Sequence, residues 1–223
     1  MDFSYKLVYS KRKNITITVE RDRTIVVRAP EHVNLNEVKS VIERKKLWLY
    51  EKLKHPQKYS EVKRKEFVSG EAILYLGKNY RLEVAKDGAE DIRFNGKFVV
   101  TGVSSDRAGH IFKKWYTQKA KEKIVPRANR FAQDIGVSFN NVIITDLKYR
   151  WGSCTPRDNI NINWKLIKAP MFVIDYVLVH ELTHLIEHNH TPRFWGIVRT
   201  QVPGYEKAKL WLKEHGAILE NDF

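Results

Sequence analysis

His180-Glu181-Leu182-Thr183-His184 is the stretch of sequence that decides the fold. It follows the run from Met171 to Val179, which is apolar except for one acidic residue, so the segment predicts a helix that is at least half buried. Residues four apart lie on one face of a helix, and both imidazoles can therefore reach one metal ion. Glu181 lies beside them, where it can polarise a water bound to that ion. The pattern predicts a site for metal-assisted hydrolysis.

A plainer interpretation of the same helix is that its histidines form hydrogen bonds to core carbonyl groups. Buried polar groups need partners, because leaving one unpaired costs about 1–3 kcal/mol. A metal ion is one such partner, and the acidic residue between the two histidines favours it. The metal site is therefore the preferred interpretation.

A third protein ligand is expected, because catalytic zinc usually takes three and leaves one position for water. The downstream candidates are Glu187, His188 and His190. A straight helix rises about 6 Å every four residues, so the chain must turn back to complete a tetrahedral site. We expect the helix to end near His188 and Asn189 to turn the chain, since asparagine tolerates the left-handed conformation. Pro192 suits the start of a new helix, and His190 is the favoured ligand.

Composition limits the class of protein. The chain has 223 residues, of which 43% are hydrophobic, enough for one large domain or two small ones. No apolar run approaches the length of a transmembrane helix, and the first residues lack the order of a signal peptide. A single cysteine fits a reducing cytosol, so we expect a cytoplasmic protein with no membrane partner. Cys154 is interpreted as a small packed residue rather than a nucleophile or a ligand.

The net charge is +14, which attracts polyanions such as nucleic acid, nucleotides or acidic proteins. The basic residues are spread along the chain in local clusters, for example 11–13, 44–46 and 63–65. A solvated basic surface and a surface that binds nucleic acid explain this pattern equally well. The sequence contains no zinc knuckle, helix-turn-helix or RNP motif that would decide between them.

The pattern of residues 1–103 predicts a strand-rich N-terminal region with one helix. Residues 3–29 alternate like strands, and Asn34 with Glu37 resembles a capping box at the start of a helix that extends to about Lys54. Glycines then separate short strands, expected near 72–76, 79–85, 91–94 and 97–101.

Residues 104–223 predict a second domain, and the whole chain an α+β fold. An apolar stripe indicates a helix over 105–134, with Pro126 interrupting the pattern. A strand over 141–147 and a hairpin over 151–163 precede the metal helix. A short helix from Pro192 and a last helix over about 204–215 follow it.

Three residues just before the metal helix are candidates for binding substrate. Arg150, Trp151 and Ser153 lie where strands could border the cleft, and an edge strand can pair with an extended peptide. Arg150 could instead bind a phosphate or a carboxylate, and Trp151 could stack on a base or fill the core.

Several motifs together resemble one known family. They are Arg150 to Cys154 (R-W-G-S-C), Ile160 to Trp164, the H-E-L-x-H of 180–184, and Asn189 to Trp195 (N-H-x-x-x-F-W). This series resembles the YgjP-like metal-dependent hydrolases, which are related to the SprT-like and WLM zinc metallopeptidases. The resemblance implies that His180, His184 and His190 bind the metal and that Glu181 is the general base. By analogy, the fold is expected to be a zincin-like catalytic domain with a central HExxH helix and a small mixed sheet.

The ligand spacing also equals that of the metzincins, H-E-x-x-H-x-x-G-x-x-H. This chain has Glu187 where those enzymes have glycine, and it shows no secretory signal. Both differences argue against a metzincin.

The predicted function is that of a cytosolic zinc-dependent hydrolase, with a peptide as the default substrate. Members of the resembled family have also been described as nucleoside triphosphate pyrophosphatases that act on UTP, and a nucleotide substrate would suit the positive charge. In that case the metal could be Mg²⁺ or Mn²⁺, although three imidazoles favour zinc or another divalent transition metal. A third alternative is a nucleic-acid-associated protein of the SprT-like type.

Overall fold

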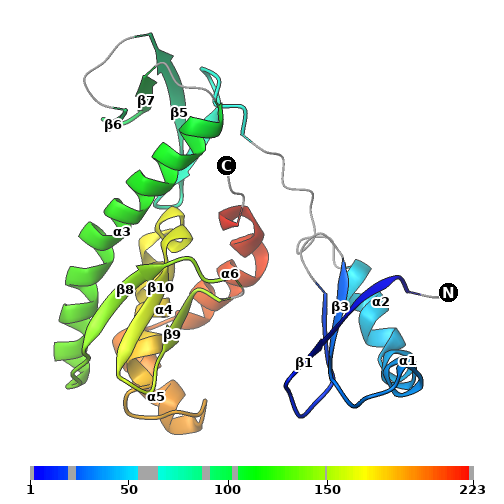
Figure 1. Ribbon diagram of the computed structural model, residues 1–223. Coiled ribbons are helices and arrows are strands. Elements are labelled where there is room, and N and C mark those ends of the chain that lie inside the picture. The colour runs from blue at the N-terminus through cyan, green and yellow to red at the C-terminus, as the bar shows by residue number, and fades with distance from the viewer. Residues whose placement is uncertain are drawn as a thin grey trace. The chain divides into compact units, whose positions relative to one another are not determined.

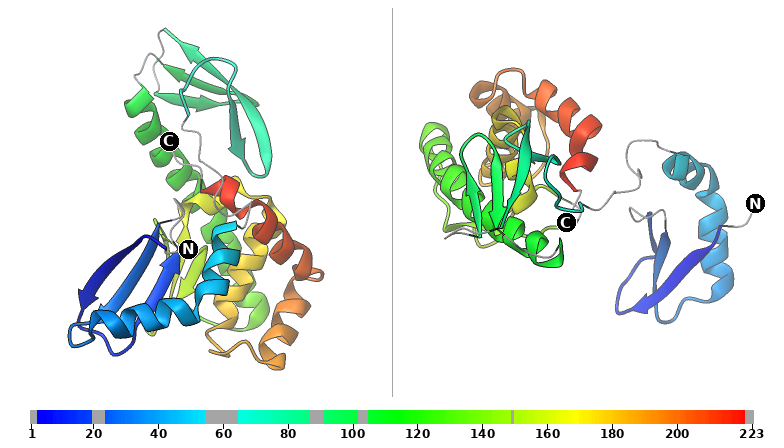
Figure 2. Two further views of the ribbon diagram at one scale, coloured as in Figure 1. Left: turned by 90° about the vertical axis from the view of Figure 1, so that its right-hand side faces the viewer. Right: turned by 90° about the horizontal axis from the view of Figure 1, so that it is seen from above.

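The computed structural model describes residues 3–19, 24–54, 65–86, 91–101, 105–148 and 150–220. The chain divides into two compact units, Met1–Val62 and Lys63–Phe223, and each is described here by itself. Both units combine helices with small mixed sheets, as the sequence predicts (Figures 1 and 2).

The first unit packs two helices on a three-stranded sheet. The strand order is β1-β3-β2, with β3 parallel to β1 and antiparallel to β2. Val27, Val38 and Leu49 are fully buried between the sheet and the helices. The elements are β1 (Tyr5–Ser10), β2 (Thr16–Val19), β3 (Ile25–Pro30), α1 (Leu35–Arg44) and α2 (Lys46–Lys54).

The single helix expected after Asn34 is broken in the structure. Asn34 does cap α1, because its side chain accepts a hydrogen bond of 2.9 Å from the backbone N–H of Glu37. At Lys45 the backbone N–H lies close to the carbonyls of both Val41 and Ile42, and α2 begins at the next residue. The break leaves Leu49 in the core, so the apolar pattern continues across it.

The second unit begins with a four-stranded sheet of order β4-β5-β7-β6, which packs on the long helix α3. Phe98 of β7 lies 5.4 Å from Phe112 of α3 between ring centroids, and both side chains are fully buried. The expected division at residue 103 would separate these strands from α3, whereas in the structure they share one core. The elements are β4 (Ala72–Tyr75), β5 (Lys78–Ala85), β6 (Ile92–Phe94), β7 (Phe98–Thr101) and α3 (Ser105–Ile135).

The turn between β4 and β5 attaches this sheet to the segment that leads into the next long helix. Gly77 has a φ of +78°, and a side chain there would lie 2.6 Å from Pro170. The backbone N–H of Gly77 donates to the carbonyl of Lys168 at 2.8 Å. Only glycine satisfies both the positive φ and the close approach, so this position fixes where the segment around Pro170 lies.

The rest of the unit is a three-stranded sheet with helices. In the order β8-β10-β9, strand β10 is parallel to β8 and antiparallel to β9, which leaves β9 at an edge among the described strands. Arg127 of α3 joins α4 through two hydrogen bonds of 2.6 Å to Asp175. The elements are β8 (Asn141–Thr145), β9 (Gly152–Cys154), β10 (Asn159–Asn163), the 3-10 helix η1 (Trp164–Lys168), α4 (Met171–Thr183), α5 (Pro192–Gln201) and α6 (Tyr205–Leu219).

Helix α3 runs through Pro126, where the sequence predicts an interruption. Ile124 and Ala128 on either side of the proline are both fully buried in the same core. This packing holds one continuous helix although proline removes a backbone hydrogen bond. Within the described ranges, each helix is too short or too polar to cross a bilayer.

Candidate metal centre

Three histidines converge at the C-terminal end of α4. His180 lies in its last turn, His184 is its C-cap residue, and His190 lies just before α5. One ring nitrogen from each lies within 4.8 Å of the others. The Nε2 atoms of His180 and His190 are 3.0 Å apart. The structure therefore brings together the three residues that the sequence predicts as ligands.

The chain turns earlier than the sequence predicts. Helix α4 ends at Thr183 rather than near His188, and the backbone N–H groups of Leu185 and Ile186 already form tighter turns to Leu182 and Thr183. The hydroxyl of Thr183 donates to the carbonyl of Val179 at 2.7 Å, a bond of the kind that bends or weakens helices. The earlier turn gives the segment from residue 185 to 189 enough length to return His190 to the cluster.

Two of the imidazoles are held neutral by their surroundings. Burial, with smaller effects of the neighbouring His184 and His190, lowers the pKa of His180 to about 3. Burial also lowers the pKa of His184, whose Nδ1 lies 3.2 Å from the carbonyl oxygen of Glu187. A neutral ring that donates from Nδ1 to this carbonyl keeps a lone pair on Nε2. Neutral imidazole is the form that binds metal ions.

A buried aromatic side chain packs against all three histidine rings. Phe194 of α5 is fully buried, and its ring centroid lies 4.9, 4.8 and 4.7 Å from those of His180, His184 and His190. Trp195 stacks on His190 with centroids 5.6 Å apart. An apolar shell of this kind limits solvent access and holds the rings in place.

Glu181 is buried beside strand β9, with 7% of its surface exposed. A side chain on Gly152 would lie 2.6 Å from Cγ of Glu181, so glycine is required for the strand to approach this closely. Burial raises the pKa of Glu181 to about 7, against the opposing effects of a hydrogen bond from the Cys154 backbone and the charge of Arg150. A carboxyl group with such a pKa can both accept and release a proton near neutral pH.

A cavity of about 960 Å³ opens onto these residues. Its lining includes His180, Glu181 and His184, together with the predicted substrate-binding residues Arg150, Trp151 and Ser153. His190 completes the histidine cluster but does not line the cavity.

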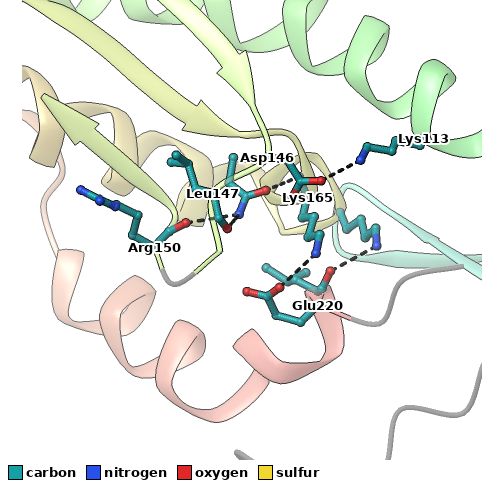
Figure 3. Close-up of polar contacts among 9 residues, drawn as sticks. Lys113, Asp146, Leu147, Arg150, Lys165 and Glu220 are labelled. Carbon is teal, nitrogen blue, oxygen red and sulfur yellow. Dashed lines mark hydrogen bonds and ion pairs between the residues drawn. The ribbon is translucent and has the colours of Figure 1, made fainter. Parts of the chain in front are cut away.

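A buried asparagine fixes the loop that carries Arg150. Asn163 is fully buried, and its side-chain amide donates to the carbonyls of Leu147 at 2.8 Å and Arg150 at 3.2 Å (Figure 3). Its side-chain oxygen accepts from the backbone N–H of Lys165 at 3.1 Å. The two bonds to Leu147 and Arg150 tie the end of β10 to the loop, so the position of Arg150 at the cavity depends on Asn163.

The sequence analysis missed Tyr176 as a residue of this site. It lines the cavity, and its ring centroid lies 5.8 Å from that of His180. Burial, with smaller contributions from Tyr205 and Glu181, raises the pKa of Tyr176 to about 12, so the phenol stays a hydrogen-bond donor. The sequence carried a clue, because residue 176 precedes His180 by four and shares its helix face.

The cluster fits a transition-metal ion. Among the described residues it consists of three imidazoles within reach of one ion, with no carboxylate in the ligand set. Imidazole nitrogen suits zinc and similar metals better than hard cations such as Mg²⁺, which prefer oxygen. Glu181 lies outside the cluster but lines the same cavity, where a water molecule could lie between it and the ion.

Comparison with known proteins identifies the class to which this chain belongs. A family model of metallopeptidase domains matches residues 13–215. The matching model is the YgjP-like metallopeptidase domain, and since it spans most of the chain, the chain belongs to the YgjP-like family. No curated protein matches the sequence.

Two solved structures show partial likeness. The metallopeptidase zymogen jannalysin of Methanocaldococcus jannaschii is 20% identical, with a TM-score of 0.37, and the match covers 41% of this chain and 92% of that one. The metallopeptidase zymogen abylysin of Pyrococcus abyssi is 21% identical, with a TM-score of 0.39, over 45% of this chain and 98% of that one.

Proposed function

We propose that this protein is a zinc-dependent peptidase with a zincin-like catalytic domain in which His180, His184 and His190 bind the metal. The observation that carries the proposal is the convergence of three imidazoles, with one ring nitrogen of each within 4.8 Å of the others, two of them on the same cavity as a buried glutamate. Membership of a metallopeptidase family supports the same reaction class.

The residues of the chain divide the chemistry between them. Bound zinc supplies Lewis acidity, which lowers the pKa of a coordinated water and stabilises negative charge on oxygen. Glu181 acts as the general base that accepts the proton of the attacking water, and it can then pass that proton to the leaving amine. Burial raises the pKa of Glu181 to about 7 in the metal-free protein, and the charge of a bound cation would favour the carboxylate that a base needs. The phenol of Tyr176, protonated across this pH range, can donate a hydrogen bond to the substrate.

An extended peptide is the substrate that the surroundings support best. Strand β9 lies at a sheet edge among the described strands, and it carries Ser153 beside the cavity. An extended peptide can add to such an edge through backbone hydrogen bonds. The guanidinium of Arg150 would favour a carboxylate near the cleaved bond.

The ligand set is tested by measuring bound zinc in the purified protein and its variants. We expect about one zinc per chain in the wild type and a loss of at least tenfold in affinity in His184→Ala and His190→Ala. His188→Ala is the matched control, because this histidine lies in the same turn but outside the cluster. Zinc loss in His188→Ala with retention in His190→Ala would overturn the ligand assignment.

The reaction is tested with Glu181→Gln, which keeps the shape of the side chain and removes the base. We expect this variant to retain zinc and to lose at least about 100-fold in kcat on peptide substrates, the scale of general base catalysis. Nucleoside triphosphates, including UTP, are assayed in parallel. Turnover of the triphosphates that depends on Glu181, without turnover of peptides, would replace the peptidase by a pyrophosphatase.

A further inference from the structure

A second cavity lies in the same unit, away from the histidine cluster. It has a volume of about 890 Å³ and shares no lining residue with the first. Its lining comes from β4, β5, β6 and residues 111–123 of α3, and β6 contacts α3 directly. The peptidase proposal makes no use of this cavity.

The floor of this cavity is aromatic. Tyr75, Tyr80, Phe94 and Trp115 all line it, and their rings are in contact. Trp115 lies 5.0 Å from Tyr75 between ring centroids, and Phe94 lies 4.9 Å from Tyr80. Tyr75 is buried, but the other three rings keep part of their surface exposed. The exposed parts of these rings can contact a flat ring of a ligand, and the Lys119 ammonium lies over the Trp115 ring at 5.9 Å.

The rim is basic. Arg93, Lys114, Lys119 and Lys123 line the cavity, against two acidic residues. Both acids are engaged already, since Glu122 binds Lys119 at 2.7 Å and Asp91 lies 3.7 Å from Arg107. Lys114 and Lys123 are both exposed, and they line the cavity from opposite flanks of the helix, because nine residues correspond to about two and a half turns. A ligand that complements this cavity therefore combines flat rings with negative charge.

We propose that this cavity binds single-stranded nucleic acid, with bases stacked on the aromatic floor and phosphates beside the lysines of α3. Aromatic floors beside basic residues are the usual way in which proteins hold single strands without reading their sequence. The net charge of +14 supports the approach of such a polyanion.

The spacing of the lysines favours a strand over a free nucleotide. Lys114 and Lys123 are nine residues apart on α3, a rise of about 13 Å along the helix. Phosphates of a stacked strand advance about 3.4 Å per nucleotide, so this distance spans about four nucleotides. A single nucleotide would reach one of the two lysines at a time.

Binding is tested with the full-length zinc-loaded protein and fluorescein-labelled eight-residue oligo(dT), by fluorescence anisotropy. If about three phosphates are neutralised, affinity falls about 20-fold between 50 and 200 mM salt. An abasic strand of equal length and charge has no rings to stack, so we expect at least about fivefold weaker binding. This comparison needs no variant of the protein. Equal affinity for the two strands would show that the bases do not stack on the aromatic residues.

The location is tested with exposed lysines. Lys114→Gln and Lys123→Gln should each reduce the slope of log affinity against log salt by about 0.7. Lys121→Gln is the matched control, because Lys121 is exposed on the same helix but does not line the cavity, and it should leave the slope unchanged. Equal losses in all three variants, or no binding at 150 mM salt, would overturn the proposal.

Competition separates the ligand classes. UMP and UTP should displace the labelled strand only weakly, and displacement at the affinity of the strand itself would identify a mononucleotide site instead. Glu181→Gln should bind the strand with the affinity of the wild type. Strand binding is therefore measured independently of peptidase activity, and one proposal can fail without the other.

Discussion

Glu181 and His180 are neighbours in sequence whose protonation responds to burial in opposite senses. Burial favours the protonated, neutral carboxyl of Glu181 and the unprotonated, neutral ring of His180. The pair is therefore built to be uncharged in the metal-free protein near pH 6. A bound cation reverses this preference for Glu181, since positive charge nearby favours the carboxylate.

The pH dependence of stability follows from these shifts in metal-free protein. The pKa of Glu181 is raised from 4.5 to about 7, so the folded state binds more protons in that window and stability falls as the pH rises through it. The pKa of His180 is lowered from 6.5 to about 3, so stability falls as the pH drops below 6.5. The two effects oppose each other between pH 4.5 and 6.5.

Glu181→Gln should remove the first effect and leave the second. We compare the free energy of unfolding of the variant with that of the wild type. As the pH rises from 5 to 8, we expect this difference to shift by about 2 kcal/mol in favour of the variant. Urea denaturation at both values, with a chelator present, measures the difference. Parallel behaviour of the two proteins would show that Glu181 is not shifted by its surroundings.

Gly152 is the backbone position that brings β9 against Glu181. A methyl group there would lie 2.6 Å from Cγ and 2.8 Å from Oε1 of Glu181, so Gly152→Ala must displace the carboxyl group. Displacements of about 1 Å in an active site cost about 100-fold in rate, and we expect a loss in kcat of that order with zinc retained. Gly196→Ala is the control, since a methyl group there meets no atom within 4 Å. Full activity of Gly152→Ala would mean that Glu181 tolerates movement and is not the base.

At the scale of elements, the loop between β8 and β9 depends on one side chain. Asn163→Ala removes the hydrogen bonds to the part-buried carbonyls of Leu147 and Arg150, and the loss of each bond costs about 0.5–1.5 kcal/mol, or about 1–3 kcal/mol for the two. We expect a loss of stability in that range and a raised KM for peptides, because Arg150 lines the cavity.

The matched control for that loop is Asn141→Ala. Asn141 is exposed at the start of β8 and binds the side chain of Asn159 at 3.2 Å, so its loss should change stability by less than about 0.5 kcal/mol. Chemical denaturation and peptide kinetics of both variants measure the contrast. An unchanged KM in Asn163→Ala would show that the loop keeps its position without these bonds.

The sequence predicted the elements better than their ends. The spacing of glycines located the strands around 72–101, and apolar residues together with proline located the helices around the histidine motif. The passage of α3 through Pro126 depends on core contacts with distant residues, and such tertiary contacts override local preference. The end of α4 at Thr183 coincides instead with a local hydrogen bond from the Thr183 hydroxyl to Val179.

Some residues of the candidate site could likewise be predicted from the sequence, and others could not. The histidines and Glu181 were predictable because helical spacing and ligand chemistry constrain residue types at fixed intervals. Asn163 and Gly152 gained their roles only from the structure, since one bonds to a loop up to 16 residues earlier and the other contacts a helix far along the chain.

At the scale of the whole molecule, the two compact units should respond differently to metal. The proposed ligands all lie in the unit Lys63–Phe223, so chelation removes the binding energy of zinc from that unit alone. We expect calorimetry to show a fall in its melting temperature on the order of 10 °C, with the transition of Met1–Val62 unchanged. A single transition that moves as a whole would show that the two units unfold together.

The structure divides the chain after residue 62, whereas the pattern of strands and helices predicts a division after residue 103. The strands over 72–101 resemble the N-terminal strands in length and spacing, but Phe98 and its aromatic neighbours bury themselves against α3. Domain membership is decided by which surfaces pack together, and a change in the type of secondary structure does not mark it.

The central claim is that three imidazoles hold a zinc ion with one position open for water. X-ray absorption at the zinc K-edge of the purified protein tests it most directly, because the edge reports the number and type of ligand atoms. The account predicts three imidazole nitrogens at about 2.0–2.1 Å and one further oxygen. A zinc–sulfur distance of about 2.3 Å, which would place Cys154 in the ligand set, or a shell with fewer than three imidazoles would contradict it.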